Sequence, residues 1–414
     1  MSVPKVCRIN VEEYLKLRES DKQLTYSGYK RSKVLQSFDK DLQRKKPVGA
    51  VYWMTELILS GAFKTLLDKC IIFFMKNINI SNPNMPEYIL DETIFLQNLL
   101  NSYKGDVFAL ADNQTFRNHI CEFVSILALS DKQRVENRIR CKDDQFNIRL
   151  LKEKMEASET YLTGIWQPAD ERIAYIPFNE FKYHLKKTYN RERAVFWISW
   201  LLELHKRYTK KKIPFEFYSR CDDIGKKHRK YFVWLVWDII LDETRNRGDN
   251  RLTRQIVSLY KLYKLNFGKR HITSRITYIL CAILYLTQTV PAIRFTLPIC
   301  NDYDVLTLMN VQINILFKGL CSRYKSVQQQ IKKREFYKQE FHNIICKRED
   351  DINIFSNKQR PQPIPKPVMQ RAVKPVMMKQ AKPVVRPNEP IMDMKYFSQV
   401  DKIANFQYRR SLNI

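Results

Sequence analysis

Basic side chains in short runs offer the clearest chemistry in this sequence. Lysine and arginine neutralise phosphates and release counterions, so such runs predict salt-dependent binding of DNA or RNA with little sequence preference. The alternative is a solvated surface that only keeps the protein soluble. We favour nucleic-acid binding, and the candidate residues are Arg44, Lys45, Lys46, Lys186, Lys187, Arg191, Arg193, Lys210, Lys211, Lys212, Lys226, Lys227, Arg229, Lys230, Lys332, Lys333 and Arg334.

The overall charge favours the same class of partner. The 414 residues include 72 Lys and Arg against 43 Asp and Glu, which gives a formal net charge of +29. This excess makes polyanions the first partners to consider. No base-reading motif accompanies the basic runs, so we expect binding that tolerates many sequences.

Histidine, cysteine and acidic residues form no recognisable catalytic or metal-binding pattern. His342 precedes Cys346 by four residues, but the second ligand pair of a closed zinc site is missing. Cys221-Asp222-Asp223 and Asp143-Asp144 could hold a metal, although acidic doublets commonly cap helices or face solvent. No nucleophile is visibly paired with a base. We therefore expect no metal, no cofactor and no enzymatic activity.

A further acidic group follows a tryptophan-rich stretch. Asp238, Asp242 and Glu243 are spaced so that their carboxylates could share one helical face. Ion pairs with Arg245 and Arg247 explain this spacing more simply than catalysis does.

Helices are the elements expected to position all these side chains. The sequence has only 9 Gly, whereas average usage would give roughly 29. Apolar residues recur every three or four positions over Tyr52–Phe74 with an interruption at Ser60-Gly61, which predicts a pair of helices. Asn82-Pro83 and Met85-Pro86 are expected to close that pair. Further helices are predicted over Glu92–Tyr103 and Thr115–Leu129.

A charged helix over Asp131–Ala157 is expected to connect this first lobe to a second one. The second lobe resumes at Phe181, and its apolar stripes carry most of the tryptophans. Five of the six Trp lie on such stripes, namely Trp53, Trp197, Trp200, Trp234 and Trp237. We expect them in the core, because a stacking platform for bases would need them exposed.

The C-terminal region differs in composition from the two lobes. Residues 358–390 hold eight Pro and eight Lys or Arg, with Lys-Pro-Val beginning at Lys366, Lys374 and Lys382. Such a segment is expected to be extended and unpacked. Residues 391–414 regain apolar side chains, which could dock either onto a partner or back onto this chain. The docking candidates are Met394, Tyr396, Phe397, Phe406 and Tyr408.

We therefore predict an all-α protein with two helical lobes, residues 1–157 and 158–357, followed by a disordered basic Pro-rich tail. The nine Cys occur singly and predict reduced thiols, which favours an intracellular location. The longest apolar window, Ile276–Thr287, is shorter than the roughly 20 residues of a membrane span, so we expect a buried helix and no membrane contact.

The segment Ala50–Pro83 resembles the helical collar of clamp-loader-related ATPases, in particular replication-associated recombination factors and Werner-helicase-interacting proteins. The matching positions are Trp53, Gly61, Lys69, Phe74 and Asn82-Pro83. The resemblance implies two antiparallel helices that make subunit contacts. The sequence departs from the family at Lys76–Asn79, where the family has an acidic pair. The 49 residues before Ala50 are too few for an ATPase module, so nucleotide hydrolysis is not implied.

The stretch SDKQLTYSGYKRSKVLQSFDKDL, followed by AVYWMTELILSG and NISNPNMPEYI, resembles a poorly characterised protein of nucleocytoplasmic large DNA viruses such as iridoviruses and chloroviruses. The resemblance implies a role in viral replication or late transcription. We expect a non-enzymatic accessory factor that contacts viral replication, transcription or core proteins and oligomerises through the collar-like helices. The alternative is a structural or scaffold virion protein packed next to the genome. The expected locations are the host cytoplasm, in a viral factory, the nucleus, and the virion.

Overall fold

The computed structural model of the protein describes residues 24–134, 139, 141, 146, 151–265, 267 and 272–320. These residues form helices, and they contain no β-strand beyond an isolated bridge between Leu24 and Lys30. The predicted all-α class is therefore confirmed. Several predicted features lie outside the described residues: Lys332, Lys333, Arg334, the segment 358–390, and Met394, Tyr396, Phe397, Phe406 and Tyr408.

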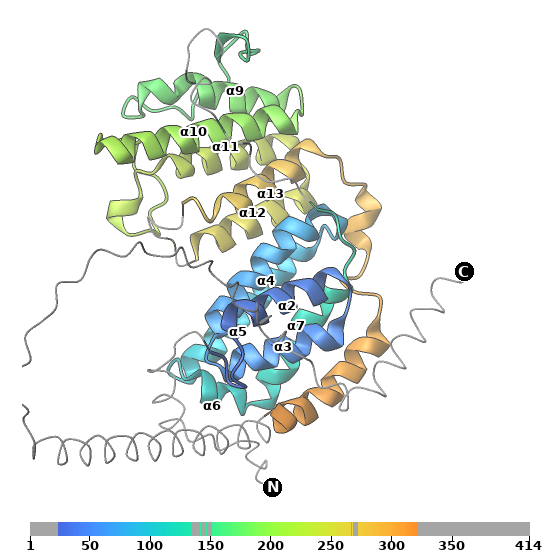
Figure 1. The fold of residues 1–414 in the computed structure, drawn as a ribbon. Helices are drawn as coiled ribbons and strands as arrows, with labels where there is room; N and C mark the ends of the chain where they lie inside the picture. Colours follow the sequence, from blue (N-terminus) through green and yellow to red (C-terminus); the bar gives the residue numbers. More distant parts are fainter. Residues whose placement is uncertain are drawn as a thin grey trace, which may run out of the picture.

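The first group of helices surrounds α3. Helix α3 (Pro47–Leu59) is buried at every position, because it has almost no polar face. It packs against α2 (Arg31–Gln43), α4 (Phe63–Asn77), α6 (Val107–Ala111) and α7 (Gln114–Leu129), while α5 (Met85–Ser102) lies along α7 (Figure 1). The one buried carboxylate of α3, Glu56, accepts hydrogen bonds of 2.7 Å from both the backbone N–H and the hydroxyl of Ser27.

The second group consists of α9 (Tyr175–Lys186), α10 (Arg191–Lys211), α11 (Phe232–Arg247), α12 (Asn250–Lys264) and α13 (Ile276–Thr287). Helices α9 and α10 form a hairpin that packs on α11 and α13, and α12 joins them from the other side. The tryptophans of α10 and α11 lie in the core between these helices. The expectation that the five Trp on apolar stripes are core residues is confirmed.

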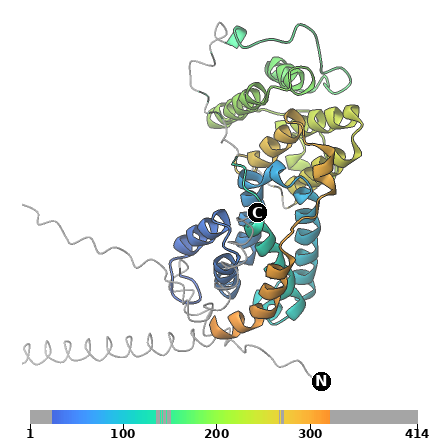
Figure 2. The same ribbon diagram turned by 90° about the vertical axis from the view of Figure 1, so that its right-hand side faces the viewer.

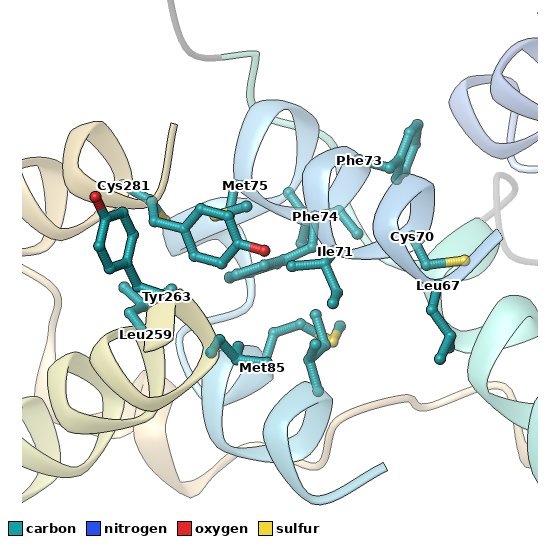
Figure 3. Close-up of a cluster of buried hydrophobic side chains, with 14 of the residues drawn as sticks. Leu67, Cys70, Ile71, Phe73, Phe74, Met75, Met85, Leu259, Tyr263 and Cys281 are labelled. Carbon is teal, nitrogen blue, oxygen red and sulfur yellow. The ribbon is translucent and has the colours of Figure 1, made fainter. Parts of the chain in front are cut away.

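The two groups share one continuous core. Helices α4 and α5 of the first group lie against α12 and α13 of the second (Figure 1). Figure 3 shows this contact, in which Phe74 and Met75 of α4 face Tyr263 of α12 and Cys281 of α13. The phenol of Tyr285 adds hydrogen bonds of 3.3 Å to the carbonyls of residues 79 and 83.

A helix that begins at residue 303 returns to the first group. The chain after α13 runs from the second group along the first, as both ribbon views show (Figures 1 and 2). The guanidinium of Arg117 on α7 donates a 2.8 Å hydrogen bond to Asn314 and lies 5.8 Å from the ring centre of Phe317. Residues 303–320, assigned to the second lobe in the sequence analysis, therefore pack on the first.

The predicted helix pair over Tyr52–Phe74 is confirmed, and so is its break. Helix α3 ends at Leu59, α4 begins at Phe63, and Gly61 turns between them with a φ of +65°. The expectation that Met85-Pro86 closes the helix pair was wrong. Helix α5 begins at Met85, and Pro86 lies in its first turn, where no backbone donor is required. The prediction of a helix beginning at Glu92 was therefore wrong at its start.

The prediction of a charged helix over Asp131–Ala157 is wrong at both ends of this range, which the structure describes. Helix α7 stops at Leu129, and residues 131–134 are irregular. The ammonium group of Lys132 donates to the carbonyls of Leu127, Ala128 and Ser130 at 2.6–3.0 Å, so it caps the helix instead of continuing it. Residues 155–158 are irregular as well, because the carboxylate of Glu180 accepts the backbone N–H groups of residues 156 and 157.

The second lobe does not resume at Phe181. Helix α9 already begins at Tyr175, and a turn at residues 187–190 separates it from α10. Asn190 ends this turn by accepting the backbone N–H of Arg193 at 3.1 Å, which is a standard N-cap. The turn places Lys186, Lys187, Arg191 and Arg193 at one corner of the molecule.

Candidate nucleic-acid interface

The structure divides the predicted basic residues among separate places. Arg44, Lys45 and Lys46 lie at the α2–α3 turn, and the four residues of the α9–α10 corner form a second group. Lys210 to Lys212 lie at the far end of α10, and Lys226 to Lys230 lie on the loop that joins α10 to α11. Helix α10 has 21 residues, so its two ends are about 30 Å apart. The predicted cations within the described ranges therefore do not form a single surface.

The largest group of basic residues lies at the far end of α10 and on the loop that follows it, and we call this group the α10-end cluster. Its members are Lys210, Lys211, Lys212, Lys226, Arg229 and Lys230. The loop after α10 folds back on the helix through aromatic contacts. The rings of Tyr208 and Phe215 lie 5.0 Å apart, those of Phe215 and Phe217 also lie 5.0 Å apart, and that of His205 lies 6.4 Å from Tyr231.

Backbone hydrogen bonds pair the outgoing and returning parts of this loop. The N–H of Phe217 donates to the carbonyl of Lys230 at 3.0 Å, and that of Arg220 donates to the carbonyl of Arg229 at 3.1 Å. Residues that are up to 20 positions apart in the sequence are thereby held at the same end of the lobe. This pairing holds Arg229 and Lys230 beside the segment that leaves the end of α10.

Arg220 fixes the loop to the body of the lobe. Its guanidinium donates two hydrogen bonds of 2.7 Å to the carboxylate of Asp170, and its Nε lies 2.8 Å from Oδ2 of Asp238 on α11. Burial raises the pKa of Asp238, and the charge of Arg220 opposes that rise. The expected pairing of this acidic group with Arg245 and Arg247 is therefore wrong for Asp238, which pairs with Arg220.

For the other two carboxylates the expectation is confirmed. Glu243 lies 3.0 Å from Arg247, and Asp242 lies 4.0 Å from Arg245. Asp242 also lies 2.7 Å from the buried ammonium of Lys182 on α9. The Asp242–Lys182 pair ties α11 to α9, whereas the other two pairs lie within α11, so all three have a structural role.

The acidic side chains of the loop are already engaged. Glu216 pairs with Lys230 at 3.0 Å, and Asp222 pairs with Arg229 at 2.9 Å. Asp223 pairs with Lys264 of α12, whose hydrogen bond and charge lower the pKa of that carboxylate. None of these described carboxylates pairs with the remaining cations of the α10-end cluster.

Four exposed lysines carry this uncompensated charge. Lys210, Lys211, Lys212 and Lys226 are exposed, and no ion pair joins them to another residue that the structure describes. Ten Lys or Arg stand against four Asp or Glu between residues 203 and 231. The side chain of Lys227 is outside the described part of the chain.

The other two basic groups are smaller or partly neutralised. Lys45 pairs with Asp131 at 2.7 Å, and Arg193 pairs with Glu156 at 3.1 Å. Lys186 and Lys187 are exposed at the α9–α10 corner. The α10-end cluster is thus the strongest candidate among the described residues for contact with phosphates.

Two features of the site were missed by the sequence analysis. One is the Asp170–Arg220 pair, which depends on a tertiary contact. The other is the extended segment 214–220, in which buried Phe215 and Phe217 alternate with exposed Glu216 and Tyr218. This alternation with a period of two is the signal that could have revealed it.

The described residues contain no group of three or more His, Cys, Asp or Glu that could hold a metal ion. His119 lies 3.4 Å from Glu92, and the described cysteines are free thiols. Burial raises the pKa of Cys121 to about 12. The His342–Cys346 and Asp143-Asp144 pairs lie outside the described ranges. Within those ranges, no helix combines the length and apolar character needed to cross a membrane.

The collar-like hairpin consists of α3 and α4. Because α3 is buried along its whole length inside the chain, any subunit contact made by this hairpin has to involve α4. Lys69 on α4 already lies 3.6 Å from Asp39 of α2. Oligomerisation through this hairpin stays a prediction.

Comparison with protein-family models found no match, and comparison with curated proteins and with solved structures found no similar protein. The resemblances to clamp-loader collars and to a protein of large DNA viruses therefore stay predictions from the sequence.

Proposed function

We propose that the protein is a non-enzymatic accessory factor that binds DNA or RNA through the α10-end cluster. Its setting is a replication or late-transcription assembly of a large DNA virus, as the sequence resemblance implies. The observation that carries the binding proposal is the set of four exposed lysines without ion pairs to described residues, at the end of α10 and on the loop that follows it.

The chemistry of these side chains fits phosphate and not base edges. Lysine is a flexible point charge, so it contacts the phosphate backbone without a fixed geometry. Arg229, the arginine of the cluster, is paired with Asp222, so the unpaired cations of the cluster are lysines. Binding that tolerates sequence and weakens with salt is the consequence.

The test measures the affinity of the full-length protein for labelled DNA by fluorescence anisotropy across a range of salt concentrations. The variant Lys210→Gln/Lys211→Gln/Lys226→Gln removes three cluster charges without reversing any. We expect its log–log salt slope for duplex DNA to fall by roughly two to three units, since each phosphate contact contributes about 0.9.

A matched control is Lys33→Gln/Lys64→Gln/Lys76→Gln. These three lysines are also exposed, and they lie on α2 and α4 of the first group. The control changes net charge equally and should leave the slope close to that of the wild type. Equal losses in both variants would assign the binding to net charge and would remove the case for a site at α10.

A further inference from the structure

Tyr218 is an exposed aromatic side chain within the α10-end cluster. Its side chain is 50% exposed, whereas the neighbouring Phe215 and Phe217 are buried. Glu216, on the same exposed side of the segment, pairs with Lys230 at 3.0 Å. Tyr218 therefore lies on the exposed side of the segment that follows α10, as Glu216 with its partner Lys230 does, and not in the core.

The backbone of Tyr218 is held in place from two directions. Its N–H donates to Asp170 Oδ1 at 2.9 Å, and its carbonyl accepts from Arg220 Nη1 at 3.2 Å. The guanidinium carbon of Arg220 also lies 5.5 Å from the ring centre. A ring fixed in this way loses little conformational freedom when it stacks on a second planar group.

We infer that the α10-end cluster binds single-stranded nucleic acid, with Tyr218 stacking on an unpaired base beside phosphates held by the lysines. The inference rests on the proposed function and narrows its substrate class. Bases in a duplex are already stacked on each other, while bases of a single strand are free to stack on an aromatic ring. A cationic surface with a fixed, exposed ring therefore favours the single strand over the duplex.

The test uses the full-length protein with fluorescein-labelled oligo(dT), oligo(U) and a duplex of the same length. The wild type should bind the single strands more tightly than the duplex. Tyr218→Leu should lower the affinity for oligo(dT) about tenfold, in line with the loss of one stacked base. Tyr218→Phe keeps the ring and should bind like the wild type.

The salt dependence separates stacking from charge. Tyr218→Leu removes no contact with a phosphate, so its log–log salt slope should equal that of the wild type. The variant Lys210→Gln/Lys211→Gln/Lys226→Gln should instead lower the slope, by about 0.7 per lost contact with a single strand.

Tyr189 provides a closely matched control at the opposite end of α10. Its side chain is 53% exposed, and Arg247 lies 5.0 Å from its ring centre. Tyr189→Leu should leave the preference for single strands unchanged. Equal effects of Tyr189→Leu and Tyr218→Leu would overturn the assignment to Tyr218.

The remaining outcomes distinguish this inference from the proposed function. If the wild type binds duplex and single strand equally, and Tyr218→Leu binds like the wild type, the stacking inference is wrong and the phosphate-binding function stands. If the wild type binds none of the three probes, both are wrong.

Discussion

Arg220 and Asp170 form a buried pair with two parallel hydrogen bonds of 2.7 Å, although they are 50 positions apart in the sequence. The pair joins the loop that precedes α9 to the loop that carries the α10-end cluster. The fork of the guanidinium matches the two carboxylate oxygens, which is the geometry that makes such pairs strong. The position of the candidate interface therefore depends on a contact between two residues outside the cluster itself.

Replacing Asp170 should destabilise the fold strongly. In Asp170→Ala, Arg220 keeps its ion pair with Asp238 but loses its buried partner. Removing one member of a buried ion pair costs about 3–5 kcal/mol of stability. The free energy of unfolding from urea titration measures the effect. Asp222→Ala is the control, because Asp222 pairs with Arg229 at the surface and should cost at most about 1 kcal/mol. Equal losses would show that the buried pair contributes no more than an exposed one.

Glu180 should make stability depend on acid pH. Burial raises the pKa of its carboxyl, but hydrogen bonds from His184 and from the backbone N–H groups of residues 156 and 157 outweigh burial and lower it. The folded state therefore binds this proton less readily than the unfolded state does. The stabilisation is complete above the ordinary pKa of 4.5 and is lost as pH falls through the lowered value.

The variant Glu180→Gln isolates this contribution. At neutral pH it should be less stable than the wild type by about 1–3 kcal/mol, because two backbone donors lose a charged acceptor. The difference between the two proteins should shrink as the pH falls below 4.5, the ordinary value for glutamate. Urea titrations of both proteins across acid pH give the comparison. A difference that stays constant with pH would contradict the role assigned to the carboxylate.

Gly49 should not tolerate a side chain. A Cβ atom at this position would lie 2.8 Å from Cγ of Asp41, whose carboxylate accepts a 3.0 Å hydrogen bond from the indole of Trp53. Gly49→Ala would force Asp41 away from that indole, at a cost of about 1–3 kcal/mol. Gly225→Ala is the control, because nothing lies within 4 Å of its added Cβ. Thermal unfolding should separate the two variants, and similar midpoints would show that α2 and α3 adjust freely.

The sequence predicted local elements better than the contacts between them. The helices around Gly61 follow from apolar spacing, because both the spacing and the turn are properties of neighbouring residues. Pro86 was misread, since proline favours both the end of one helix and the first turn of the next. The return of Lys230 to the segment after α10 could not be predicted, because this segment is held by contacts of Phe215 and Arg220 with residues elsewhere in the fold. The runs of lysine indicated candidate phosphate contacts, but they did not indicate which runs lie close together in the fold.

Lys212 offers a way to separate stability from binding. It ends α10 in the left-handed region with a φ of +57°, which costs a lysine about 1–2 kcal/mol more than a glycine. Lys212→Gly should therefore be at least as stable as the wild type. It should also bind oligo(dT) more weakly, with a salt slope lower by about 0.7, because one phosphate contact is lost.

Lys104 is the matched control for this prediction. It is exposed, it follows α5 in the first group, and its φ is +53°. Lys104→Gly relieves the same backbone strain and removes the same charge, so it should gain similar stability without changing the salt slope. Thermal unfolding and anisotropy titrations on both variants give the two readouts. If Lys104→Gly lowers the salt slope as much as Lys212→Gly does, the position of the lysine on the molecule does not matter. This result would argue against a binding site at the end of α10.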